Sequence, residues 1–170
     1  MQAAIAIIVF AVMLIAKAVY DVKKAKELDI AVMSKRLSIN RALKGKLRLL
    51  KFICSTLESI GKEVPEEVKD MSLGVMTTVT EQLDAFNDLK SLEEEVLWYA
   101  KKAKADDCLE LKAELAQVES TNDRIVKCCK AYNGALNDYY ELVNFPIKRI
   151  FFRALLFKQH EYFTVTKIMK

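Results

Sequence analysis

The chain opens with sixteen residues that carry no charged side chain, and a cluster of lysines follows directly. As a helix, residues 1–16 rise about 24 Å, and residues 18–20 extend the span to about 30 Å, the thickness of one hydrocarbon core. Lys17 can reach the headgroups from within this span because its aliphatic stem is long. The pattern predicts a transmembrane helix over residues 1–20 and a basic flank beside the membrane, formed by Lys17, Lys23, Lys24 and Lys26.

The charge pattern also predicts the orientation of this anchor. The α-amino group is the only positive charge before the apolar run, so the positive-inside rule places the amino terminus outside and the rest of the chain in the cytoplasm. A cleaved signal peptide is the alternative, because Ala16-Lys17-Ala18 has the small-x-small form of a cleavage site. Residues 1–4, however, lack the basic segment of a secretory signal. A reducing compartment also fits the cysteines, which show no disulfide framework: Cys54, Cys108, Cys128 and Cys129.

Composition favours helices over strands throughout the chain. Only 4 Gly and 2 Pro occur in 170 residues, while Ala, Leu, Lys and Glu dominate. The length left after the anchor suits one domain with its own core. We therefore predict an all-α fold: a transmembrane helix at residues 1–20, an antiparallel up-and-down bundle of three to four long helices at 21–145, and a short C-terminal helix and tail at 146–170, packed on the bundle or the membrane.

The most regular helix is predicted between Cys108 and Val143, where seam residues recur in steps of three and four over about five heptads. Asp106 and Asp107 are its expected cap and first-turn acids, and Pro146 marks its end because the residue before a proline avoids the helical region. The pattern leaves open whether this seam closes within one chain or between chains.

Two further helices are predicted with less regular patterns. One spans residues 65–104, with Gly74 as a weak point near its start. The other continues from the anchor to Gly61, and the sequence leaves open a break near residues 38–45. Without that break, three long antiparallel helices leave Val143 far from the membrane, whereas a break there returns Val143 to the bilayer.

Charge is divided unevenly along the chain. Residues 17–60 carry a net charge of +7, residues 61–142 carry −8, and residues 143–170 carry +5. Pairing between helices of one bundle accounts for most of this division. Basic residues beside the membrane also attract anionic headgroups, by about 1 kcal/mol each. The apolar and basic segment 146–170 is interpreted either as a helix that covers the end of the bundle or as an interfacial helix on lipid.

A set of residues in the second half of the chain resembles a known family. Tyr132-Asn133, Tyr139, Phe145-Pro146 and Tyr162-Phe163 follow Glu119, Thr121 and Arg124-Ile125 with spacing similar to the carboxy-terminal half of LemA family proteins. The chain departs from that pattern at Tyr140, Leu156 and Glu161, so the resemblance is to a divergent member. It implies a single-pass anchor in a bacterial inner membrane with its amino terminus outside, a cytoplasmic helical bundle, and no settled biochemical activity.

The same residues have a physical interpretation as packing residues. Tyr132 and Tyr139 occupy seam positions one heptad apart, so their rings are expected in the core and their hydroxyls at its edge. Asn133 lies beside the seam and is a candidate partner for a hydroxyl. The remaining residues are expected to stop the helix or to pin the tail: Phe145, Pro146, Tyr162 and Phe163.

The sequence offers little material for catalysis. His160 is the only histidine and is expected in a mobile tail, and Cys128 and Cys129 are adjacent on a helix, where buried small side chains are the expected role. No Gly-rich phosphate loop occurs, and the acidic run at Glu93 is typical of a solvated helix surface. We therefore predict no catalytic residue, no cofactor and no metal. The basic stretch 35–51 alternates with a buried face, so no nucleic acid is expected.

These observations favour a non-enzymatic, membrane-anchored scaffold or assembly factor for protein partners. The alternative is an inner-leaflet lipid-binding or membrane-remodelling protein. The expected partners are membrane lipid and unidentified proteins, and a homo-oligomer is left open.

Overall fold

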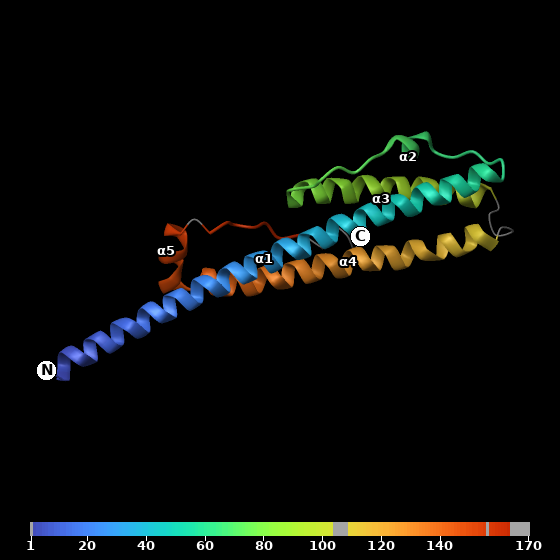
Figure 1. Cartoon of the computed structure of the whole chain (residues 1–170). Helices are drawn as coiled ribbons and strands as arrows, with labels where there is room; N and C mark the ends of the chain where they lie inside the picture. Colours follow the sequence, from blue (N-terminus) through green and yellow to red (C-terminus); the bar gives the residue numbers. More distant parts are fainter. Residues whose placement is uncertain (1, 104–108, 156, 164–170) are drawn as a thin grey trace.

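The computed structural model describes residues 2–103, 109–155 and 157–163 and is all-helical, with no strand among them (Figure 1). This confirms the predicted fold class, a long apolar N-terminal helix packed against later long helices. The elements are α1 (Gln2–Ser59), α2 (Glu66–Asp70), α3 (Val79–Lys102), α4 (Leu109–Val143) and α5 (Pro146–Ala154). Asp106, Asp107 and Cys108, expected to begin α4, lie outside the described residues, as do residues 164–170 of the tail.

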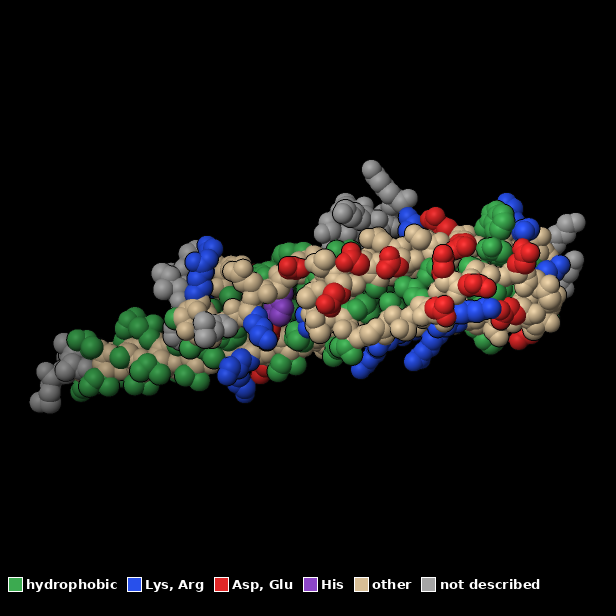
Figure 2. All heavy atoms as spheres, turned by 90° about the horizontal axis from the view of Figure 1, so that it is seen from above, with side chains coloured by type: hydrophobic (Ala, Val, Ile, Leu, Met, Phe, Trp, Pro, Cys, Tyr) green, Lys and Arg blue, Asp and Glu red, His purple; other side chains and the backbone are tan. Residues whose placement is uncertain are grey.

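α1 is one helix of 58 residues that includes both the apolar opening and the first helix of the bundle. It has no break near residues 38–45. Its first part projects beyond the rest of the molecule, and apolar side chains cover it on the face seen in Figure 2. A window of 18 residues there has a mean hydropathy of 2.3, so length and composition allow it to cross a membrane. Ile7 and Ile15, for example, are 69% and 65% exposed.

The helix predicted at residues 65–104 is wrong in its first part. Only the short α2 forms there, the chain is extended from residue 71, and α3 begins at Val79. A capping box fixes this start: the Glu81 amide donates to Thr78 Oγ1 at 3.1 Å, and the Thr78 amide donates to Glu81 Oε2 at 3.1 Å. Because Thr78 satisfies donors that a continuing helix would have bonded internally, α3 starts here and not at Pro65.

The extended return changes the direction of α3. Gln82 Nε2, near the start of α3, donates to the Arg36 carbonyl at 3.1 Å, and Lys102 Nζ, at its end, lies 3.3 Å from Glu63 Oε2. α3 therefore runs in the same direction as α1, and only α4 runs against them (Figure 1). α4 returns to the level of residues 21–29 although α1 is unbroken. The expectation that an unbroken α1 leaves Val143 far from the membrane-proximal end is wrong, because it assumed a reversal at every connection.

The core lies between α1 and α4, with α3 covering its distal part. The predicted seam of α4 is confirmed, because seven of its residues are buried: Leu111, Val118, Ile125, Cys129, Tyr132, Leu136 and Tyr139. Glu114, which is not a seam residue, is buried as well. One ion pair is enclosed among the three helices: Lys46, 2% exposed, contacts Glu93, which also accepts from Asn122 Nδ2 at 2.9 Å. Glu93 was expected on a solvated surface. A buried lysine needs such partners because removing a charge from water is costly.

The C-terminal region fills the position that α3 leaves empty. α5 turns away at the end of α4, with Phe152 buried, and residues 157–163 then run extended along α4 toward the start of α3 (Figure 1). The rings of Phe152 and Phe157 pack edge to face with centroids 5.1 Å apart. We call residues 157–163 the strap. It covers the part of the α1–α4 pair that is nearest the apolar segment of α1.

Candidate functional site

The strap is held by a face of α4 that carries Tyr132, Asn133, Tyr139 and Tyr140. These residues are spaced by one, six and one positions, so they recur after one heptad and share one side of the helix. Tyr132 and Tyr139 are essentially inaccessible to solvent, while Asn133 and Tyr140 are half-buried. The heptad spacing that buries the tyrosine rings therefore also places the polar groups of these four side chains along one side of α4, where the strap lies.

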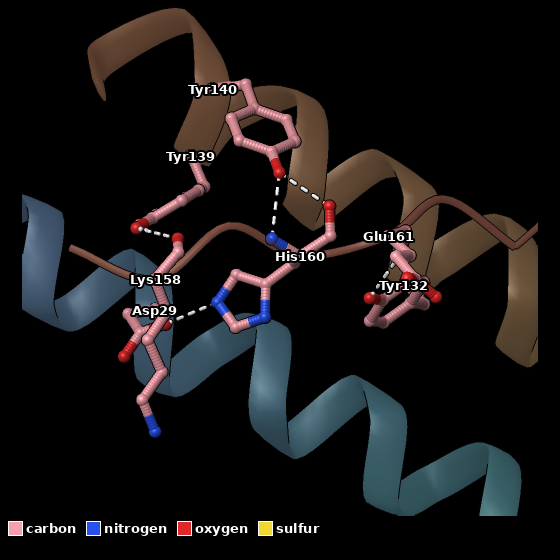
Figure 3. A network of polar contacts seen from close by, with 7 residues as sticks. All are labelled: Asp29, Tyr132, Tyr139, Tyr140, Lys158, His160 and Glu161. Atoms are coloured by element: carbon pink, nitrogen blue, oxygen red, sulfur yellow. Dashed lines mark hydrogen bonds and ion pairs between the residues drawn. The ribbon is translucent and has the colours of Figure 1, made fainter. Parts of the chain in front are cut away.

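The tyrosine hydroxyls bind the backbone of the strap (Figure 3). Tyr132 Oη donates to the Glu161 carbonyl at 2.8 Å, and Tyr139 Oη donates to the Lys158 carbonyl at 2.8 Å. Tyr140 Oη donates to the His160 carbonyl at 2.5 Å and accepts from the His160 amide at 2.8 Å. These contacts satisfy backbone groups that an isolated extended segment leaves unpaired.

Asn133 completes the line of contacts at the far end of the strap. Its Nδ2 donates to the Phe163 carbonyl at 2.7 Å, and its Oδ1 accepts from the Phe163 amide at 2.9 Å. The Phe163 ring is buried, and the neighbouring Tyr162 Oη donates to Asn137 Oδ1 at 2.9 Å. The side-chain amide of Asn133 thus bonds both backbone groups of Phe163, as the backbone of a neighbouring β-strand would.

His160 fastens the middle of the strap to α1. Its Nε2 lies 2.6 Å from Asp29 Oδ1, and its ring meets Tyr139 edge to face with centroids 5.4 Å apart. The His160 side chain is only 6% exposed, so the expectation of a histidine in a mobile tail is wrong. The heptad pattern could not reveal this contact, because Asp29 and His160 are 131 residues apart in the sequence.

Burial keeps the tyrosine donors protonated. It raises the pKa of Tyr139 to about 12, with further contributions from the carboxylate of Asp29 and from Tyr140. Burial also raises the pKa of Tyr132, and the nearby Arg36 offsets only part of that change. Both hydroxyls therefore remain hydrogen-bond donors across the physiological range.

The residues of the family-like pattern thus divide into two groups. The structure brings Tyr132, Asn133, Tyr139, Tyr162 and Phe163 together at the strap. The dipeptide 145–146 lies instead at the corner between α4 and α5, where the Phe145 carbonyl accepts from the amides of residues 148 and 149 at 2.9 and 2.8 Å. The pattern did not include Tyr140, Asp29 or His160; Tyr140 stood out in the sequence only as a departure from it.

A second polar cluster joins α5 to the part of α1 that follows its apolar segment. Asp21 is buried, and its carboxylate forms ion pairs with Lys148 Nζ at 2.9 Å and with Lys17 Nζ at 3.5 Å. Burial opposes ionisation of Asp21, but the two lysines outweigh it and lower its pKa. We call the basic residues at this level the collar, and all except the half-buried Lys148 are exposed: Lys17, Lys23, Lys24, Lys26, Lys148, Arg149 and Arg153. Figure 2 shows basic side chains where the apolar end of α1 meets the bundle.

The thiols are placed as packing residues. Burial raises the pKa of Cys54 to about 11 and that of Cys129 to about 12, so neither is a thiolate near neutral pH. Cys128 is half-buried, and all three are free thiols. Within the part of the chain that the structure describes, no three His, Cys, Asp or Glu side chains are grouped to hold a metal ion.

Comparison with models of known protein families, with curated proteins and with solved structures finds no match to this chain. The geometry of the strap, the collar and α1 therefore carries the functional argument.

Proposed function

We propose that this chain is a non-enzymatic, membrane-anchored scaffold of a bacterial inner membrane, with its amino terminus outside and its bundle in the cytoplasm. The continuity of α1 from Gln2 to Ser59 carries the proposal. A separate anchor on a linker would only tether a domain, but here the apolar segment and the core helix form one rod. The helix continues without interruption through Ala18, which supports retention of the anchor over cleavage there. The bundle is then held at a fixed height and direction.

We further propose that the chain is a divergent relative of LemA family proteins. The support is that five residues of the pattern act together at the strap although they come from two segments of the chain. Their contacts are structural, which agrees with a signature that shapes a bundle and does not bind a ligand.

The membrane-distal end of the bundle offers a surface for a protein partner. Trp98 on α3 is 56% exposed, and Lys102 Nζ lies over its ring, 5.2 Å from the centroid. The adjacent Leu97 is 38% exposed. Exposed tryptophans are frequent anchors of protein interfaces because they bury a large area with few rotatable bonds.

Photo-crosslinking in native membranes tests the scaffold proposal. A photoreactive residue at Trp98 is expected to capture one reproducible protein, while the same residue at Lys130, exposed on α4 away from this end, serves as the matched control. An identical set of adducts from both positions, or none from Trp98, contradicts the proposed partner surface.

Lipid binding at the inner leaflet is a second candidate function, favoured by the contact between Lys148 and Asp21. That contact holds α5 at the level of the juxtamembrane lysines, so Arg149 and Arg153 add to the same basic zone. A chain that starts at Asp21 should bind vesicles containing phosphatidylserine and not vesicles of phosphatidylcholine alone, and salt should weaken the binding. Arg149→Glu with Arg153→Glu should abolish it, while Lys112→Glu should not. Equal binding to both vesicle types contradicts this function.

A further inference from the structure

An open groove lies between α1 and α4 on the side away from the strap. Residues 138 and 142 are each two positions from Tyr140, about 160° around the helix, so they face away from the strap. Phe145, at the end of the groove, is 53% exposed. The groove has a volume of about 490 Å³ and is lined by Lys24, Leu28, Asp138, Glu141, Leu142 and Phe145. It offers an apolar floor with two exposed carboxylates at its rim.

A second uncovered surface lies on the outer face of α1. Lys23, Lys26, Ile30 and Leu37 are spaced by three, four and seven residues and therefore share one side of the helix. All four are exposed, Ile30 by 68% and Leu37 by 51%. We call these four residues the outer face. It combines two positive charges with two large apolar side chains.

The outer face and the groove complement each other in charge, and they lie at a similar distance from the apolar segment of α1, which we call their height. Lys26 of the outer face lies near the height of Glu141 in the groove, and Ile30 lies near that of Asp138 and Leu28, because Tyr139 of α4 is level with Asp29 of α1. Lys24 is the one groove side chain with the same charge as these lysines. Both surfaces involve residues 23–30 of α1, so two copies anchored in one membrane present them at the same height. A soluble chain would have to find this register by diffusion, whereas a shared anchor supplies it.

We propose that the outer face of α1 in one copy of this chain docks into the α1–α4 groove of a second copy in the same membrane. The inference rests on the membrane-anchored bundle proposed above. The two surfaces differ, so the contact is head to tail and leaves one outer face and one groove free in each pair. The contact therefore extends into a ring or a row of copies. Confinement to the membrane raises the effective concentration of copies, so a small contact suffices.

Thiol crosslinking between two tagged forms of the full chain in membranes tests this arrangement. One form carries Ile30→Cys and the other carries Phe145→Cys, and a bismaleimide whose arm spans about 10 Å, the rise of seven helical residues, should link the two forms to each other. The native chain under the same reagent reports any background from its own cysteines. Trp98→Cys paired with Phe145→Cys is the matched control, because Trp98 is also exposed but lies at the distal end. A single chain with both Ile30→Cys and Phe145→Cys should give bands beyond the dimer.

Charge reversal in trans separates docking from chance collision. Asp138→Lys with Glu141→Lys in the Phe145→Cys form should lower the yield of the mixed adduct about tenfold. Lys23→Glu with Lys26→Glu in the other form should restore it, which a misfolded groove would not allow. Restoration of the adduct therefore supports direct pairing of these charges.

The alternative outcomes are distinct. Adducts only between two Ile30→Cys forms would show a symmetric contact and overturn the proposal, as would capture of Phe145→Cys by a different protein. No mixed adduct from a chain found in the membrane fraction overturns this inference and leaves the scaffold proposal standing. A chain found in the soluble fraction overturns both.

Discussion

At the residue scale, the strap is held mainly through its backbone. Tyr132, Tyr139 and Tyr140 bind carbonyl groups, and Asn133 binds both backbone groups of Phe163. Only two strap side chains are fully enclosed at this site, those of Phe163 and His160. Substitutions should therefore be tolerated best at the exposed positions Lys158, Gln159 and Glu161, because α4 binds the backbone of residues 158 and 161 and not their side chains.

The phenol of Tyr139 should make the fold sensitive to alkaline pH. Its pKa rises from the ordinary 10.0 to about 12 in the folded chain, so the neutral form is favoured on folding. Its contribution to stability is complete below pH 10 and is lost as the pH rises from 10 to 12, by about 2 to 3 kcal/mol. Urea unfolding of native and Tyr139→Phe chains across this range measures it. Equal pH slopes for the two chains would contradict the assignment.

The buried ion pair is the second residue-scale prediction. Glu93→Ala leaves Lys46 buried without its partner and should destabilise the chain by about 3 to 5 kcal/mol. Replacing both residues by Met removes both charges and should recover most of that loss. Thermal unfolding of the single and double variants decides this: a double variant as unstable as Glu93→Ala would show that the packing, and not the stranded charge, is responsible.

The seam tyrosines could be predicted from the sequence, but their partners could not. Tyr132 and Tyr139 follow the heptad, which depends only on neighbours three and four residues away. The groups they bind lie 19 to 29 residues further along, in an extended segment without any periodicity. The same holds for Lys46 and Glu93. A charged residue is predicted to lie on the surface unless its partner is known, and the partner in this pair comes from another helix.

At the scale of elements, the long helices were predictable and the connection between α2 and α3 was not predicted correctly. Period and length predicted α4 and the extent of α1, because both bury a stripe of side chains, but they left a break in α1 near residues 38–45 open. The error at residues 65–104 came from extending an apolar pattern across Thr78. The sequence Thr78-Val79-Thr80-Glu81 is itself a capping-box signal, so this boundary was available from local chemistry.

The capping box at the start of α3 should contribute measurably to stability. Thr78→Ala removes the acceptor for the Glu81 amide and should cost about 1 kcal/mol. Thr80→Ala is the matched control. Thr80 lies two residues after Thr78 and is also exposed, so its substitution should change the melting temperature little. Thermal unfolding followed by circular dichroism compares the two variants. Equal effects would mean that the hydroxyl of Thr78 does not fix the start of α3.

At the scale of the whole molecule, the extended return before α3 decides which end of the bundle lies beside the apolar segment of α1. Because residues 71–78 carry the chain back, α3 and α1 run in the same direction and α4 ends beside Asp21. The collar, the strap and α5 are thereby gathered at the end beside the apolar segment of α1, while Trp98 lies at the other end. Helix lengths alone could not predict this arrangement, because they do not show whether two successive helices run in the same or in opposite directions.

The orientation of this assembly in the membrane can be measured directly. In the proposed orientation, in which the basic residues after Ala16 keep the bundle in the cytoplasm, Gln2→Cys should react with a membrane-impermeant maleimide added to intact cells. Trp98→Cys should react only after the cells are opened. The half-buried or buried native thiols Cys54, Cys128 and Cys129 should contribute little background, and the native chain measures it. Labelling of Trp98→Cys in intact cells, with loss of residue 2 from the mature chain, would instead establish a cleaved signal peptide and an external bundle.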